Sequence, residues 1–295
     1  MKKKLVFKGA ATALVTPFIN GNIDYNALDA IVEHQIAGGI SALVIGGTTG
    51  EAATLSPTER FELYGYAKAK VAGRAKLIFG TGTNDTRVAI EHTKMAEELR
   101  ADGVLIVTPY YNKGTHKGVL EHYKRIASET DLPIILYNVP ARTGVNLTIK
   151  QLAELSKIKN IVGIKEAADS IDRLTEISGF GDELYLYAGN DTQIYPTLAL
   201  GGMGVISVIS NLYPAFVKNI CHNYFQGNTE ESRCGQLKIF NLSRTMFTET
   251  NPTPIKYAMS LHGLCRAELR LPLAEAEERT KDEIKKEISD FEGAI

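Results

Sequence analysis

The stretch Asn160-Ile-Val-Gly-Ile-Lys-Glu-Ala-Ala168 has the character of a buried strand that ends at a charged residue. The four residues before Lys165 are all apolar or glycine. A continuous run of this kind is typical of a strand covered on both faces in a parallel sheet. We therefore predict a strand over residues 161–165 in a protein of the α/β class.

Seven similar runs occur along the chain, and an amphipathic segment of helical period follows each of the eight. Some helix starts carry clear caps: Ser56-Pro57-Thr58-Glu59 combines an N-cap serine, a proline and a capping-box glutamate. The predicted strands cover residues 12–15, 42–45, 76–80, 104–108, 134–138, 161–165, 184–188 and 205–208. The predicted helices cover residues 26–37, 58–71, 87–99, 118–129, 149–155, 171–180, 192–200 and 215–226.

Eight βα units in steady succession predict a TIM (β/α)8 barrel followed by a small C-terminal helical region. A doubly wound open sheet is the alternative, but the nearest approach to a dinucleotide fingerprint, Gly80-Thr-Gly-Thr-Asn-Asp85, lacks its last glycine. After the barrel only helices are expected, over residues 231–247, 254–262 and 273–288. The predicted division is a catalytic barrel domain at 1–227 and a C-terminal helical domain at 228–295.

Composition narrows the class of protein. The formal net charge is -1 and there is no long run of one sign, so no nucleic-acid surface is expected. No apolar stretch approaches the ~20 residues of a membrane span, and Lys2-Lys3-Lys4 is better explained as a charged tail before a strand than as a secretory signal. The three cysteines and six histidines lack the spacing of metal ligands or of a disulfide framework. We expect a cytoplasmic protein with no metal.

Lys165 is expensive to bury, because its charged form loses its hydration. A desolvated lysine holds a larger share of the neutral amine, the form that attacks a carbonyl to give a Schiff base. The alternative is a strand-end lysine whose head reaches solvent. The residues at the ends of the other predicted strands help to decide between a Schiff-base lysine and a solvent-exposed one.

Active sites of such barrels lie at the carboxyl ends of the strands. In this sequence, residues suited to bind or react with a substrate follow several of the predicted strands. Gly46-Gly-Thr-Thr-Gly-Glu51 offers backbone N–H groups and two hydroxyls that suit a carboxylate or phosphate, although an ordinary glycine-rich turn is the alternative. Thr108-Pro-Tyr-Tyr-Asn112 brings two tyrosines to the same mouth. Tyr137-Asn-Val-Pro-Ala-Arg-Thr-Gly144 adds Arg142, which is either a carboxylate clamp or a surface arginine.

Tyr137 and Lys165 close successive strands. Successive side chains of a strand point to opposite faces of the sheet. Ile135 is therefore expected on the same face as Tyr137, and Ile161 and Gly163 on the same face as Lys165. If both groups face the barrel interior, the phenol and the amine meet, and the small Gly163 leaves room beneath them. A tyrosine beside a Schiff-base lysine is suited to shuttle protons.

These motifs, taken in order, resemble the dihydrodipicolinate synthase family of the pyruvate-dependent class I aldolases. The resemblance runs from about residue 9 to the C-terminal helices and so covers nearly the whole chain. It rests on Gly46-Gly-Thr-Thr-Gly-Glu51, Thr108-Pro-Tyr-Tyr-Asn112, Tyr137-Asn-Val-Pro-x-Arg-Thr-Gly144, Gly163-Ile-Lys-Glu166, Gly189-Asn-Asp191 and Glu249-Thr-Asn-Pro252.

The resemblance implies a lyase that condenses pyruvate with L-aspartate 4-semialdehyde, in the diaminopimelate route of lysine biosynthesis. It implies an imine between Lys165 and pyruvate, without a cofactor. Tyr137 would move protons, and Thr49 would link it to Tyr111 of a neighbouring subunit. A homotetramer of two tight dimers is the implied assembly.

The resemblance also implies how the substrates are held. Thr48 and Thr49 would bind the carboxylate of pyruvate, partly through backbone N–H groups. Arg142 would meet the carboxylate of the semialdehyde at the mouth of the barrel. The backbone at Gly189 and Ile206 would line the pocket around the lysine.

Two alternatives accompany this prediction. N-acetylneuraminate lyases and keto-deoxy sugar-acid aldolases use the same imine on longer, polyhydroxylated substrates. Paired Thr48 and Thr49, where sialic acid lyases tend to carry Ser-Thr, and the presence of Arg142 favour the acidic aldehyde. A non-catalytic metabolite-binding barrel is the alternative from another class, since fold alone does not give function.

Regulation by the end product lysine is expected to be weak or absent. Asn84 and Tyr110 match the effector site of lysine-inhibited members of the family. Pro57, Arg60 and Val88 replace the histidine and glutamate residues usual there, so little would attract the effector's ammonium groups.

Overall fold

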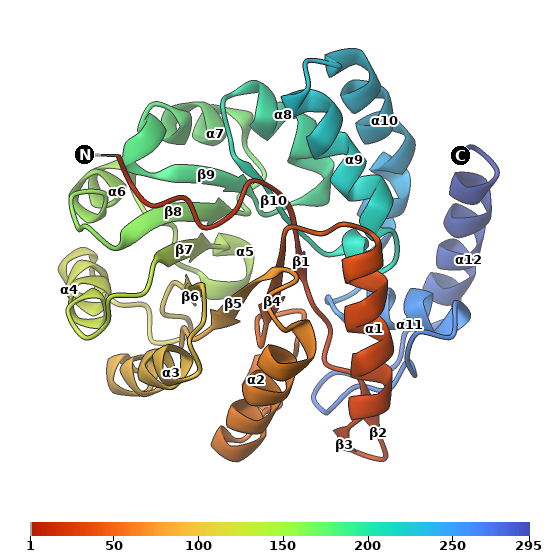
Figure 1. Cartoon of the computed structure of the whole chain (residues 1–295), viewed down its shortest axis with the longest axis horizontal. Helices are drawn as coiled ribbons and strands as arrows, with labels where there is room; N and C mark the ends of the chain where they lie inside the picture. Colours follow the sequence, from red (N-terminus) through yellow and green to blue (C-terminus); the bar gives the residue numbers. More distant parts are fainter. Residues whose placement is uncertain (1) are drawn as a thin grey trace.

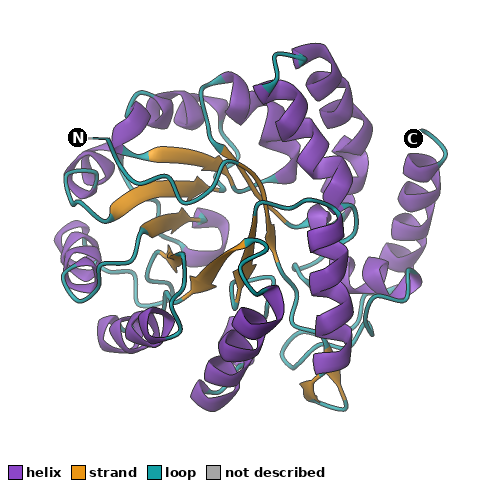
Figure 2. Ribbon diagram, in the orientation of Figure 1, coloured by secondary structure: helices purple, strands orange, loops and turns teal. Residues whose placement is uncertain are grey.

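Eight parallel strands close into a barrel in the computed structural model of this chain, which describes residues 2–295. Strand neighbours follow the order β1-β10-β9-β8-β7-β6-β5-β4, and β4 pairs with β1 to complete the ring. The prediction of a (β/α)8 barrel rather than an open sheet is therefore confirmed (Figure 2). The strands are β1 (Gly9–Ala13), β4 (Ala42–Ile45), β5 (Lys76–Gly80), β6 (Gly103–Val107), β7 (Ile134–Asn138), β8 (Ile161–Glu166), β9 (Tyr185–Ala188) and β10 (Gly204–Ser207).

Helices surround the ring of strands (Figure 1). At the start of α2, Ser56 and Glu59 form the predicted capping box. The helices that follow barrel strands are α1 (Tyr25–Ala37), α2 (Pro57–Val71), α3 (Thr86–Glu98), α4 (His116–Ala127), α6 (Ile149–Leu155), α7 (Ile171–Ser178), α8 (Ile194–Ala199) and α9 (Pro214–Phe225). Elements that were not predicted are a hairpin of β2 (Phe18–Ile19) and β3 (Asn22–Ile23), the single turn α5 (Pro140–Thr143), and 3-10 turns at Ala52–Thr54, Gly181–Glu183, Asp191–Gln193 and Ile209–Asn211.

The first strand begins earlier than predicted, at Gly9 rather than at residue 12. Glycine and alanine have little intrinsic preference for strands, so residues 9–11 gave no sequence signal. They form a strand because β10 pairs with them from Gly9 to Thr12. At Gly204 an added Cβ would overlap the Gly9 carbonyl, so the close approach of β1 and β10 depends on that glycine.

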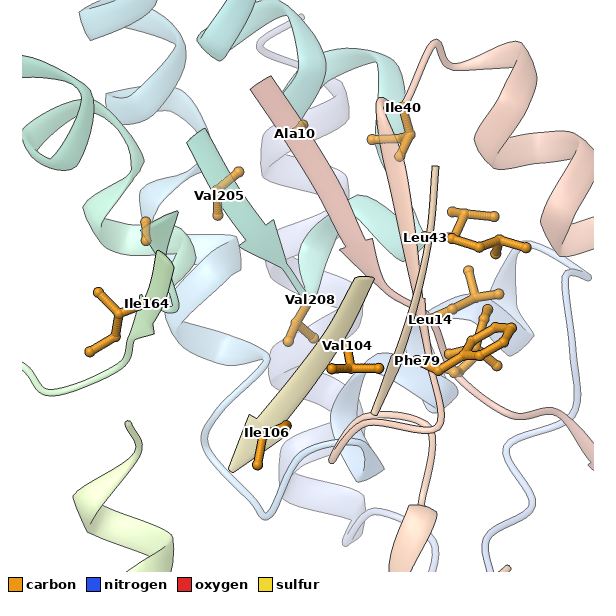
Figure 3. Close-up of a cluster of buried hydrophobic side chains, with 14 of the residues drawn as sticks. Ala10, Leu14, Ile40, Leu43, Phe79, Val104, Ile106, Ile164, Val205 and Val208 are labelled. Carbon is orange, nitrogen blue, oxygen red and sulfur yellow. The ribbon is translucent and has the colours of Figure 1, made fainter. Parts of the chain in front are cut away.

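Two apolar layers hold the barrel. The outer layer fills the space between strands and helices, where Phe79 of β5 stacks on Tyr64 of α2 with ring centroids 4.1 Å apart. Figure 3 shows part of this layer, including Leu43, Phe79 and Ile164 on three of the strands. The inner layer lies inside the barrel and includes Tyr137 of β7. Burial of both layers removes a large apolar area from water, which drives folding.

Ile161 was predicted to face the barrel interior with Lys165, and this was wrong. Ile161 belongs to the outer layer, whereas Val162 packs in the inner one. The cause is a register shift between β7 and β8: Ile134 pairs with Ile161, but the next residue pairs with Gly163. A bulge of this kind inserts one residue and changes which side chains share a face.

The C-terminal helices are α10 (Thr229–Thr245), α11 (Thr253–Leu261) and α12 (Glu278–Glu292). The first two lie close to the predicted positions, but the third starts at Glu278 rather than at residue 273. Residues 263–277, which we call the strap, are not helical. Tertiary contacts hold the strap in this form, and Arg270 makes several of them. None of the helices within residues 2–295 combines the length and the apolar character that a membrane crossing needs.

Arg270 ties the strap to α2 and to the β2–β3 hairpin. Its guanidinium makes a two-point contact with the Glu59 carboxylate, with 3.0 Å between Nη1 and Oε2, and also donates to the carbonyls of Thr54 and Gly21. It lies over the Phe18 ring, 4.5 Å from the centroid. The hydrogen bonds from Arg270 lower the pKa of Glu59 from its ordinary value of 4.5 to about 2, against the opposing effect of burial.

Because the folded state holds the Glu59 carboxylate ionised, this contact stabilises the protein above pH 4.5 and is lost as the pH falls from about 4.5 to about 2. We expect Glu59→Gln to lower the free energy of unfolding by about 1–2 kcal/mol at pH 6, after allowance for partial exposure. The difference between the two proteins should shrink as the pH falls below about 4.5 and should approach zero only below about pH 2. Urea unfolding of both proteins at several pH values tests this, and a gap that does not change with pH would contradict it.

Candidate active site

Lys165 and Tyr137 lie side by side at the carboxyl ends of neighbouring strands. They are register partners in the β7–β8 pair, and the Lys165 Nζ is 4.4 Å from the centroid of the Tyr137 ring. Both side chains are buried, with exposed fractions of 4% and 7%. The Lys165 side chain is therefore enclosed by the barrel, which argues against a strand-end lysine whose head extends into solvent.

The floor beneath Lys165 is aromatic. Tyr187 of β9 is the register partner of Lys165 on its other side, stacks on Phe7 at 4.4 Å and donates its hydroxyl to the Phe7 carbonyl. A Cβ at Gly163 would lie 2.8 Å from the Tyr185 carbonyl oxygen and 3.2 Å from the Tyr187 ring. Glycine is therefore required at position 163, and the room it leaves is filled by the tyrosine ring.

A buried polar network fixes the strand ends from the outer side. Asn138 and Glu166 follow Tyr137 and Lys165, pair in register, and are joined by a hydrogen bond of 2.8 Å. The Glu166 carboxylate also accepts from Arg173 Nε at 2.8 Å and from the Ala168 N–H at 2.8 Å. Sequence reasoning missed this network, although a Lys-Glu pair at a strand end with an arginine on the next helix was a usable signal.

A small chamber of about 140 Å³ surrounds the lysine head. Of the residues predicted from the sequence, it brings together Lys165, Tyr137, Thr49, Arg142 and Gly189. The chamber is also lined by Val139, Ala141, Ala167, Asn190, Val208, Phe247 and Asn251.

Thr49 lies against the C-terminal segment. Its side chain is buried, and its Oγ1 accepts a hydrogen bond of 3.0 Å from Asn251 Nδ2. Thr48 lines the adjoining cavity of about 300 Å³, whose walls also include Tyr137 and Arg142. Within residues 2–295 the backbone N–H groups of Thr48 and Thr49 donate to no carbonyl oxygen. The turn therefore offers unused donors at the edge of the chamber.

Arg142 is held by the same asparagine. It sits on the single turn α5, is largely exposed, and donates from Nη2 to the Asn251 carbonyl at 2.9 Å. Asn251 thus joins Thr49 through its side chain and Arg142 through its backbone. No role for Asn251 was predicted, because a contact 202 residues away from Thr49 leaves no mark on local sequence patterns.

Of the three remaining residues predicted for the site, Gly189 lines the chamber, whereas Ile206 and Tyr111 do not. A Cβ at Gly189 would lie 2.6 Å from the Glu166 carbonyl oxygen, so glycine is required. Ile206 is buried in the inner layer, and Val208, two residues further on, reaches the chamber. Tyr111 is 90% exposed, has a positive φ of 68°, and does not line the chamber of its own chain.

Arg60 is one of the residues on which the prediction about lysine inhibition rests, and its side chain is fixed by internal hydrogen bonds. It is buried and donates to the carbonyls of Ala52 and Gly80, at 2.8 and 3.1 Å. Its fixed positive charge would repel an effector's ammonium groups, so weak or absent lysine inhibition stays our prediction. Among residues 2–295 no group of three or more His, Cys, Asp or Glu side chains is arranged to hold a metal ion.

Comparison with known proteins gives the family. The model of the dihydrodipicolinate synthetase family matches residues 6–291. The chain belongs to this family. The predicted resemblance is thereby confirmed over almost the whole length.

Individual relatives agree with that assignment. The chain is 43% identical to 4-hydroxy-tetrahydrodipicolinate synthase of Clostridium novyi over 97% of both chains, and 46% identical to that of Thermotoga neapolitana over 95% of this chain and 97% of the relative. The crystal structure of dihydrodipicolinate synthase from Thermotoga maritima has a TM-score of 0.95 and 41% identity, covering 98% and 99% of the two chains. The names of these relatives support the predicted synthase activity over the two alternative activities, those of the sialic acid lyases and the sugar-acid aldolases.

Proposed function

We propose that this chain condenses pyruvate with L-aspartate 4-semialdehyde through an imine on Lys165, in the diaminopimelate route of lysine biosynthesis. The observation that carries the proposal is the buried Lys165 amine beside the Tyr137 phenol in a chamber that Thr49 also lines. A structure from Acinetobacter baumannii, with 39% identity over 98% of this chain and 99% of that one and a TM-score of 0.94, is a complex of this enzyme type with pyruvate.

The first step forms the imine. The neutral Lys165 amine attacks the ketone carbon of pyruvate, and the oxygen leaves as water after protonation. The N–H groups and hydroxyls of Thr48 and Thr49 hold the pyruvate carboxylate, which orients the ketone toward the amine.

Tyr137 then manages the protons. Its ring centroid lies 4.4 Å from the Lys165 Nζ, and in the proposed reaction its hydroxyl gives a proton to the leaving oxygen and takes one from the methyl carbon of the imine. The resulting enamine carbon attacks the aldehyde carbon, and the aldehyde oxygen becomes a hydroxyl. The amino group of the former semialdehyde then displaces Lys165 from the imine carbon and closes the ring.

Arg142 selects the acceptor. An arginine has five N–H donors, and one of them holds the side chain to the Asn251 carbonyl. The others are available for a carboxylate, the group that separates aspartate semialdehyde from a neutral sugar chain. Arg142 lines the lysine chamber and also two neighbouring cavities. This position suits a residue that lies between the two proposed substrates.

The imine is tested by reduction. Borohydride with pyruvate should add a pyruvate-derived mass to Lys165, because reduction converts the imine to a stable amine. Lys165→Ala should lose both the adduct and the synthase activity. Lys150→Ala, which removes an exposed lysine of α6, is the matched control and should keep both. A wild-type protein that gains no mass would favour a non-catalytic barrel.

The acceptor is tested at Arg142. We expect Arg142→Leu to raise the KM for aspartate semialdehyde by about 10–100-fold, the loss expected for a hydrogen bond between charged groups. Borohydride trapping of pyruvate should be unchanged. Arg125→Leu, which removes an exposed arginine of α4, is the control. Faster turnover of N-acetylneuraminate than of aspartate semialdehyde by the wild-type protein would overturn the assignment.

A second copy of the chain completes the site in our proposal. Tyr111 is exposed in its own chain, so it can serve as the outer end of the proton path from Tyr137 and Thr49 only by entering a neighbouring subunit. We propose a homotetramer built from two such dimers. One solved structure, with 41% identity and a TM-score of 0.94, is described as a monomeric dihydrodipicolinate synthase variant.

Mixed assemblies test this exchange. Tyr111→Phe should lower kcat by about 100-fold through the loss of a proton-transfer group, and Lys165→Ala should be inactive. When the two variants are unfolded and refolded together, mixed dimers should regain activity, because one site then has both an intact lysine and its partner's tyrosine. Mixed subunits no more active than the separate variants would contradict the proposal.

We also propose that the protein acts in the cytoplasm, where pyruvate is available. Its three cysteines, Cys221, Cys234 and Cys265, are unpaired within residues 2–295. Free thiols of this kind are usual in a reducing compartment.

A further inference from the structure

A fully buried ion pair joins the threonine turn to the C-terminal helices. Lys256 Nζ lies 2.5 Å from Glu51 Oε1, and neither side chain has any exposed surface. Glu51 ends the turn that carries Thr48 and Thr49, and Lys256 lies on α11, five residues after Asn251. The pair is outside the lysine chamber, and the proposed chemistry does not use it directly.

Every charged atom of the pair has a partner. Besides Glu51, the Lys256 ammonium donates to the Glu268 carbonyl at 2.9 Å and lies 4.2 Å from the centroid of the Phe18 ring. The second oxygen of Glu51 accepts from the backbone N–H of Arg270 at 3.1 Å. The Glu51 carboxylate is therefore held at both oxygens, by the Lys256 ammonium and by the Arg270 N–H, and Lys256 is itself held by Glu268 and Phe18.

The turn is sensitive to where Glu51 sits. Glu51 has a φ of 52°, in the left-handed region that non-glycine residues seldom adopt. Its N–H donates to the Thr48 carbonyl at 3.1 Å, and Thr16 Oγ1 donates to the Gly50 carbonyl at 2.7 Å. A shift of Glu51 would therefore move the backbone that presents Thr48 and Thr49.

We propose that Lys256 is a positioning residue for the binding of pyruvate: through Glu51 it holds the turn whose threonines receive the substrate carboxylate. This inference rests on the proposed function. The hydrogen bond from Asn251, just before α11, to Thr49 is a second tether, so the segment from Asn251 to Lys256 holds the turn at two points. Stability alone does not require the charges, because apolar residues of similar volume replace buried ion pairs without loss in many proteins.

The test replaces both charges at once, since removing only one leaves the other buried without a partner. Glu51→Gln with Lys256→Met keeps the size of both side chains and an acceptor for the Arg270 N–H. We expect this double variant to fold and to show a KM for pyruvate about 10-fold or more above that of the wild-type protein. At saturating pyruvate, borohydride should still label Lys165 fully, because the lysine itself is unaffected.

Leu242→Ala is the structural control. Leu242 is a buried residue of α10, outside the chamber, and its truncation lowers thermal stability without touching the turn. A double variant whose KM for pyruvate stays within twofold of this control overturns the proposal. If the double variant does not fold, Glu51→Gln with Lys256→Gln, which also removes both charges and lets the two side-chain amides hydrogen-bond each other, is measured against the same criterion. Failure of the proposed function is distinguishable, because wild-type Lys165 would then gain no pyruvate-derived mass.

Discussion

The register of β7 on β8 is the constraint on which the site depends. It places Tyr137 opposite Lys165, and it follows a bulge at which the pairing moves by one residue. A slip of one residue in a strand turns each side chain to the other face of the sheet. Lys165 would then point toward the helices, into the layer that Ile164 now occupies. The chemistry therefore depends on a local irregularity as much as on the barrel.

The same irregularity marks the limit of prediction from sequence. Apolar runs and capping boxes were sufficient for the eight strands, the closed barrel and the strand-end positions of Lys165 and Tyr137. Alternation failed at Ile161, because a bulge resets the period and leaves no local signature. The strap and the role of Asn251 were missed for another reason: both depend on partners about 200 residues away, and periodicity reports only on near neighbours.

Two buried polar networks support the residues of the lysine chamber. In the first, Glu166, Arg173 and Asn138 lock the ends of β7 and β8; in the second, Glu51 and Lys256 lock the threonine turn. Each surrounds a fully buried carboxylate with directional donors, because a buried charge without partners would be costly. A well-satisfied network has few alternative geometries. The nucleophile and the turn proposed to hold its substrate are thus placed independently, by networks that share no residue.

The size of the chamber separates the two proposed substrates. Its volume of about 140 Å³ is well below the ~300 Å³ at which pockets for larger ligands begin, so it suits a three-carbon acid bound to Lys165 but not both substrates together. The acceptor must then approach from a cavity outside the chamber. Arg142 and Asn251 line the chamber and also two neighbouring cavities, of about 300 and 780 Å³. Asn251 holds Arg142 through its carbonyl and Thr49 through its amide. One residue of the C-terminal segment therefore sets the spacing between the group proposed to hold the donor and the group proposed to hold the acceptor, whereas the barrel supplies the nucleophile.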